Sequence, residues 1–120
     1  MVNYFESDFA HPIILGNHKE SIYAANLIKR KTVLSVTLVA SKLSLLEKIR
    51  FRHISLVSHS DDIRLLTLTD IPKRMAEYET PILIFSEEHD GKFVSENLPL
   101  LETLYILIPT EKLNSFFEGI

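Results

Sequence analysis

The chain has 120 residues, of which 46% are hydrophobic and 24% are charged, and its formal net charge is -3 at pH 7. This length suits one globular domain with a substantial core, and the acidic balance argues against a nucleic-acid surface, which carries a clustered basic excess. The absence of cysteine excludes disulfides, thiolate metal ligands and cysteine nucleophiles. The first residues lack the layout of a secretory signal, and no apolar run approaches the roughly 20 residues that span a bilayer. We therefore expect a cytoplasmic protein that binds neither nucleic acid nor membrane.

The first predicted elements are a strand at 12–15 and an amphipathic helix that follows directly after Gly16. Asn17 is the expected N-cap, and Glu20 follows it at the capping-box spacing. The helix shows an apolar stripe at helical periodicity, made by Tyr23, Ala24, Leu27 and Ile28. A strand-to-helix turn of this kind lies at the carboxyl edge of open α/β sheets, where ligands usually bind.

The middle of the chain continues the alternation. Strands are predicted at 33–40 and 54–57, and residues 41–47 form either a helical turn or a loop between them. Short helices are expected to begin at Ser60 and Asp70, with Met75 and Tyr78 facing inward. The segment 63–68 is compatible with either a helix or an extended chain.

The last third of the chain contains two more predicted strands, at 81–85 and 104–108. The helix between them, at 90–98, is expected to stop before Pro99, because proline disfavours helix in the preceding residue. A final helix runs from Thr110, with Leu113, Phe116 and Phe117 on one side.

Strands that alternate with helices imply a mostly parallel sheet with right-handed crossovers and helices on both faces. Near-continuous hydrophobicity, as in 33–40, is typical of strands buried between two helical layers. We therefore predict a three-layer, Rossmann-like α/β sandwich with about five strands, formed by residues 1–120 as a single domain.

The motifs of common phosphate and nucleophile sites are absent from the sequence. The dinucleotide fingerprint needs three glycines where this chain has only Gly16. No P-loop and no serine nucleophile elbow follows a strand. The five histidines show no metal-ligand spacing. We therefore predict neither a catalytic residue nor a metal site.

Two polar turns remain as a candidate ligand-binding site. Gly16, Asn17 and His18 follow the first strand, and Ser86 and Glu87 follow the fourth. In a doubly wound sheet both turns lie at the carboxyl edge and can face one crevice. The alternative is that both are ordinary turns with capping residues.

The run from Asp8 to Asn17, followed by Tyr23-Ala24-Ala25-Asn26, resembles the opening of the N-terminal domain that precedes the catalytic core in ATP-grasp enzymes. The resemblance is to the carboxylate–amine ligase and carbamoyl-phosphate-synthase-like group, and it continues through 82–88, 96–98 and 104–109. It thus covers nearly the whole chain, although no single motif in it is diagnostic. The opening loop departs from the family, which often has an aspartate where this chain has Asn17-His18-Lys19.

The resemblance implies a non-catalytic pre-ATP-grasp domain that shapes the substrate side of a cleft, contacts a small-molecule substrate and packs on an ATP-grasp core in cis or as a protein partner. ATP and magnesium would bind only to that core, so no cofactor is expected in this chain. The chain would then be a fragment or remnant, and any activity would be that of a longer ATP-dependent carboxylate–amine ligase. The alternative is a free-standing interaction domain that binds a protein or forms a homodimer through Phe116 and Phe117.

Overall fold

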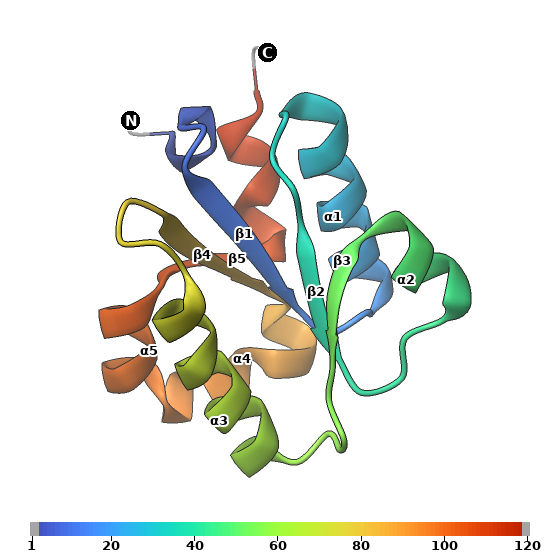
Figure 1. Ribbon diagram of the computed structural model, residues 1–120, viewed down its shortest axis with the longest axis vertical. Helices are drawn as coiled ribbons and strands as arrows, with labels where there is room; N and C mark the ends of the chain where they lie inside the picture. The colour runs from blue at the N-terminus through green and yellow to red at the C-terminus, as the bar shows by residue number, and fades with distance from the viewer. Residues whose placement is uncertain (1–2, 119–120) are drawn as a thin grey trace.

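The computed structural model describes residues 3–118 and arranges them in three layers (Figure 1). Five strands form one parallel sheet in the order β3-β2-β1-β4-β5. Their bounds are β1 Ala10–Leu15, β2 Thr37–Ala40, β3 Arg52–Ser55, β4 Thr80–Phe85 and β5 Ile106–Pro109. Because helices cover both faces of this sheet, the prediction of a Rossmann-like α/β sandwich is confirmed.

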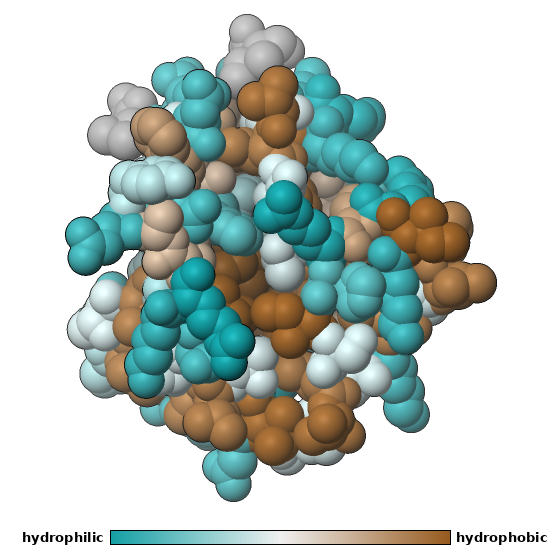
Figure 2. Space-filling view, in the orientation of Figure 1, coloured by the Kyte–Doolittle hydropathy of each residue, from teal (hydrophilic) through white to brown (hydrophobic). Residues whose placement is uncertain are grey.

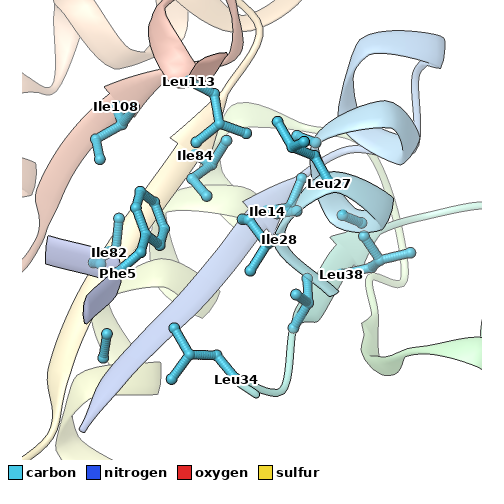
Figure 3. Close-up of a cluster of buried hydrophobic side chains, with 14 of the residues drawn as sticks. Phe5, Ile14, Leu27, Ile28, Leu34, Leu38, Ile82, Ile84, Ile108 and Leu113 are labelled. Atoms are coloured by element: carbon cyan, nitrogen blue, oxygen red, sulfur yellow. The ribbon is translucent and has the colours of Figure 1, made fainter. Parts of the chain in front are cut away.

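One face of the sheet is covered by α1 (Lys19–Lys31) together with the 3-10 segments η1 (Tyr4–Glu6) and η3 (Thr110–Phe116). Figure 3 shows their apolar side chains meeting those of β1, β2 and β4, with Ile14, Ile28 and Ile84 fully buried between the layers. The short helix α2 (Leu45–Arg50) lies beside α1, where Arg50 donates to the Asn26 side chain. Apolar burial of this kind is the dominant stabilising term of the fold.

The other face carries α3 (Asp61–Asp70), its extension η2 (Ile71–Arg74), α4 (Glu87–Glu96) and α5 (Leu98–Leu104). The Tyr105 hydroxyl donates to the Leu68 carbonyl oxygen over 2.6 Å in this layer. Four residues after Leu68 stands Pro72, which has no N–H to offer that carbonyl, so the tyrosine replaces the missing helical bond. Burial raises the pKa of Tyr105 well above its usual value.

Several local expectations for the first half of the chain are wrong. The N-cap of α1 is His18 rather than Asn17, and its side chain makes no capping bond. Tyr23 is exposed because the buried stripe is shifted to Ala25. β2 begins only at Thr37, since Val33 is 90% exposed in the loop before it. The predicted ends of these elements came from local sequence propensity, whereas the observed ends depend on packing against the sheet.

The second half of the chain shows similar differences. Residues 63–68 are helical within α3, which settles that ambiguity. Tyr78 faces outward and packs edge-on against Phe9, with ring centroids 5.1 Å apart. The helix predicted to stop before Pro99 ends at Glu96, and Pro99 instead lies in the first turn of α5, where its missing N–H costs no bond.

The two aromatic residues near the end of the described chain are covered. Phe117 is buried against Phe5, with ring centroids 5.2 Å apart, and Phe116 contacts both Phe5 and Tyr4. The Asn3 side chain also donates to the Phe116 carbonyl oxygen over 2.7 Å. Phe117 is therefore not available as an exposed contact, whereas Phe116 is partly buried, and binding of a partner through this end stays a prediction. Within residues 3–118, no helix has both the length and the apolar character that crossing a membrane requires.

Candidate ligand-binding site

The candidate site lies where the sheet topology reverses. From β1 the chain crosses to β2 and β3 on one side, and from β3 it returns to β4 on the other. β1 and β4 are adjacent and parallel, with Ile14 paired to Ile84, so the turns that follow them are neighbours. In Figure 1 the arrowhead of β1 points to the start of α1, near the start of α4. Ligands of open α/β sheets bind in the crevice at such a switch point.

Gly16 provides the turn that brings a histidine over this edge. Its φ is +89°, a conformation that side chains rarely adopt. A Cβ added to it would lie 3.0 Å from Cδ2 of His18, so the absence of a side chain is what allows the ring to fold back. The Gly16 N–H donates to the Val39 carbonyl oxygen over 2.7 Å and is thus engaged within the sheet.

Asn17 connects the first turn to the loop that precedes α2. Its Nδ2 donates to the Lys42 carbonyl oxygen over 2.9 Å and to Glu47 Oε1 over 3.0 Å. Glu47 also completes a capping box with Ser44 at the start of α2. The hydrogen bond from Asn17, followed by that from the Ser44 backbone, lowers the pKa of Glu47. Both side-chain donors of Asn17 are therefore committed to holding two loops together.

His18 is part of a polar cluster that bridges the two layers. Its ring stacks on that of His89 in α4, with centroids 3.8 Å apart and planes 11° from parallel. Its Nε2 lies 3.8 Å from Oδ2 of Asp90, whose side chain is 1% exposed. The other Asp90 oxygen accepts from Nη1 of Arg64 in α3 over 2.6 Å. The guanidinium carbon (Cζ) of Arg64 also lies 4.2 Å from the centroid of the Phe93 ring.

Three atoms of this cluster are buried without a hydrogen-bond partner: His18 Nε2, Asp90 Oδ2 and Arg64 Nε. Buried polar atoms are nearly always paired in folded proteins, because an unpaired one costs about 1–3 kcal/mol. Unpaired atoms at a switch point therefore mark a place where a water molecule or a ligand group can complete the pairing.

Ser86 and Glu87 begin α4 at the opposite side of the crevice. Ser86 is fully buried, and its hydroxyl accepts from the His89 N–H, which makes it the N-cap. The Glu87 N–H donates to Oε1 of Glu111 over 3.2 Å, and the Glu88 N–H bonds the same carboxylate. Desolvation raises the pKa of Glu111, but hydrogen bonds outweigh it and hold the pKa below its usual value: first that from the Glu111 backbone itself, then those from Glu87, Thr110 and Glu88.

These bonds decide what kind of ligand group suits the crevice. The first N–H groups of α4, which in other proteins bind phosphate, are already taken by Ser86 and Glu111. The carboxylates of Glu20, Glu87 and Glu88 stand on the same rim. The site is therefore better suited to a hydrogen-bond donor or a cationic group than to an anion.

Hollows of ligand size are present at and away from this edge. One of about 300 Å³ lies beside the cluster and is lined by Lys19, Glu20, Tyr23, Thr110 and Glu111. Another, of about 700 Å³, lies along α3 and β3 and is lined by Ile54, Leu66, Thr67, Asp70, Ile71 and Arg74. We give the smaller hollow more weight because it adjoins the polar cluster at the switch point.

The structure thus brings both predicted turns to one edge, and it adds four residues that the sequence analysis missed: Glu20, Arg64, His89 and Asp90. His89 and Asp90 were within reach of that analysis, since they stand in the first turn after the fourth predicted strand. Arg64 left no such sign, because its contact with Asp90 spans 26 residues.

A scan of protein-family models and searches of curated proteins and solved structures each gave no match to the chain. The structural class of this domain is therefore assigned from its fold. The chain forms a Rossmann-like α/β domain with a parallel five-stranded sheet and a polar cluster at its topological switch point.

Proposed function

We propose that this chain is a non-catalytic ligand-binding domain of the pre-ATP-grasp type, which supplies the substrate side of a cleft to an ATP-grasp core. The ligand-binding part rests on two neighbouring buried atoms at the switch point, His18 Nε2 and Asp90 Oδ2, neither of which has a hydrogen-bond partner. The pre-ATP-grasp part is supported by the sequence resemblance and is compatible with the fold. A cytoplasmic location belongs to the same proposal.

The chemistry of the rim supports a small molecule that carries an ammonium or hydroxyl group. Asp90 Oδ2 can only accept a hydrogen bond when ionised, and His18 Nε2 can accept or donate. The two atoms lie 3.8 Å apart and are both covered from solvent, so a ligand group reaches them only when the His18 side chain, which is 29% exposed, moves aside. Nucleotide binding is disfavoured by the carboxylates at this rim, in keeping with ATP and magnesium binding to a separate core.

Calorimetry with ATP and magnesium tests the non-catalytic part of the proposal. The described domain should give no measurable heat of binding, and clear micromolar nucleotide binding would overturn the proposal. NMR titration with a panel of primary amines, amino acids and hydroxy acids tests the ligand site. A binder from this panel should shift the amide signals of 16–21 and 86–90.

A matched pair of variants makes the ligand test specific. His18→Ala should abolish those shifts, whereas His59→Ala, which changes an exposed histidine outside the site, should leave them unchanged. Equal behaviour of the two variants, or shifts confined to other parts of the sheet, would contradict the assignment of the site.

A second candidate function, self-association or binding of a protein partner, is favoured by the apolar surface of α2. Leu45, Leu46 and Ile49 are 74%, 63% and 72% exposed, and Figure 2 shows apolar side chains gathered on the outer side of this helix. Exposed apolar groups of this kind often mark an interface. Sedimentation should then show a concentration-dependent dimer that Leu45→Ser with Ile49→Ser disrupts. A concentration-independent monomer would exclude self-association.

A further inference from the structure

The first turns of α1 and α4 bring together two carboxylates and a histidine at the rim of the ligand site. One donor atom from each of Glu20, Glu88 and His89 lies within 4.8 Å of the others. Glu20 comes from the helix on one face of the sheet, and the other two come from the helix on the opposite face. The spacing of histidines along the sequence gives no sign of this group, because it has one histidine and Glu20 lies 68 residues before Glu88.

The geometry of the closest pair fits a metal ion. His89 Nε2 and Glu20 Oε2 are 3.3 Å apart. Two ligands at about 2.0–2.1 Å from a tetrahedral zinc ion are themselves separated by about 3.3–3.4 Å. The exposed Glu88 carboxylate offers a third donor atom, which lies within 4.8 Å of the other two. A site with three protein ligands leaves further positions for water.

The hydrogen bonding of Glu20 provides an independent sign. Its Oε2 is covered from solvent and, despite its proximity to His89, has no partner with hydrogen-bond geometry. A covered carboxylate oxygen without a donor is costly. Among residues 3–118, the side chain of Glu88 makes no hydrogen bond or ion pair that would compete for it. The nearest arginine of the cluster, Arg64, is engaged by Asp61 and Asp90.

The stack of the two histidine rings orients the His89 ring, whose Nε2 is the proposed metal ligand. Asp90 lies beside His18, and the His18 ring lies parallel to His89, which sets the plane of the His89 ring.

The local charge balance also favours a cation. Two ionised carboxylates contribute two negative charges, and the amino ends of α1 and α4 oppose them with about +0.5 each. A mixed imidazole and carboxylate donor set suits zinc and its first-row neighbours, whereas calcium and magnesium prefer oxygen ligands alone.

We propose that Glu20, Glu88 and His89 bind a divalent first-row transition-metal ion of the zinc class, which links α1 to α4 across the switch point. The link joins the two helical layers, so binding should raise the stability of the domain as well as fill the site. The proposed metal ligands stand on the rim of the small-molecule site, but the inference does not depend on that site, because His18 Nε2 and Asp90 Oδ2, which carry the small-molecule proposal, do not bind the ion.

The test is calorimetric titration of the metal-free chain with Zn²⁺ alone, supported by the visible absorption of Co²⁺. We expect one ion per chain, a thermal midpoint that rises with Zn²⁺, and binding that weakens in acid because the histidine must be deprotonated. His89→Gln, Glu20→Gln and Glu88→Gln should each weaken binding by at least about tenfold, the low end of the loss seen when even an outer partner of a metal site is removed.

Matched controls separate this site from incidental binding to other histidines. His59→Gln and Glu96→Gln change an exposed histidine and an exposed carboxylate away from the group, and both should keep the affinity of the parent chain. Binding that is unaffected by His89→Gln, or that falls equally in the control variants, would overturn the proposal. Absence of any binding below millimolar Zn²⁺ would also overturn it. Because no small molecule is added, these outcomes are independent of whether the ligand site exists.

Discussion

Replacement of Asp90 by asparagine should destabilise the domain strongly. The change keeps the shape of the side chain but removes its charge, and thus leaves the buried Arg64 guanidinium, whose side chain is 7% exposed, without its closest counter-ion. Loss of one partner of a buried ion pair costs about 3–5 kcal/mol. We expect about 3 kcal/mol here, at the lower end of that range, because Asp61 still accepts from Arg64 over 2.7 Å.

Thermal unfolding followed by circular dichroism measures this loss. With about 2.1 cal/mol/K of unfolding entropy per residue, a 120-residue chain has an unfolding entropy of about 0.25 kcal/mol/K. A loss of about 3 kcal/mol then lowers the midpoint by about 12 °C. Asp61→Asn is the matched control, since that carboxylate is mostly exposed and its pair with Arg64 should contribute less than about 1 kcal/mol, or about 4 °C.

The outcome that would refute this reasoning is an Asp90→Asn midpoint no lower than that of Asp61→Asn. Should Asp90→Asn fail to fold, the double variant Arg64→Met with Asp90→Leu keeps the prediction testable. Replacement of both charges by apolar groups is often neutral or stabilising. We therefore expect the double variant to recover stability relative to Asp90→Asn, and continued failure to fold would contradict the electrostatic explanation.

Three further predictions concern other single residues. Gly16→Ala should lower the free energy of unfolding by about 1–3 kcal/mol in urea denaturation, because an alanine is strained at the φ of +89° that this position requires. Gly91→Ala should instead raise the free energy of unfolding by about 0.5–1 kcal/mol, because Gly91 lies in the interior of α4 and has room for a Cβ. Tyr105→Phe should cost about 1–3 kcal/mol through loss of the bond to a helix carbonyl. In the parent chain the raised pKa of Tyr105 means that this tyrosine ionises in the unfolded state first, so stability should fall as the pH rises through about 10. Asn17→Ala should raise the pKa of Glu47 in an NMR titration towards its usual value.

For each of these predictions, a specific experimental result would contradict it. Equal effects of alanine at Gly16 and Gly91 would show that backbone conformation does not limit the first turn. Full ionisation of all tyrosines near pH 10 in the folded chain would contradict the burial of Tyr105. An unchanged Glu47 pKa in Asn17→Ala would show that the capping box alone holds this carboxylate.

The sequence by itself determined the alternation of strands and helices and hence the fold class. Periodicity and apolar runs are local properties, and they identify a buried strand such as 81–85 without knowledge of its neighbours. The same reasoning placed polar turns after the first and fourth strands, because a parallel sheet sends all its carboxyl ends to one edge. Boundaries such as that at Val33 depended on packing, which local propensity does not contain.

Only the tertiary structure decided how the residues of that edge combine. Asn17 was expected to cap its own helix, yet it bonds a carboxylate 30 residues away. The stack of His18 on His89 and the pairing of Arg64 with Asp90 likewise join segments that meet only after the crossovers have formed. Side-chain contacts between distant segments depend on how the layers are placed in space, and a local sequence pattern carries no record of that placement.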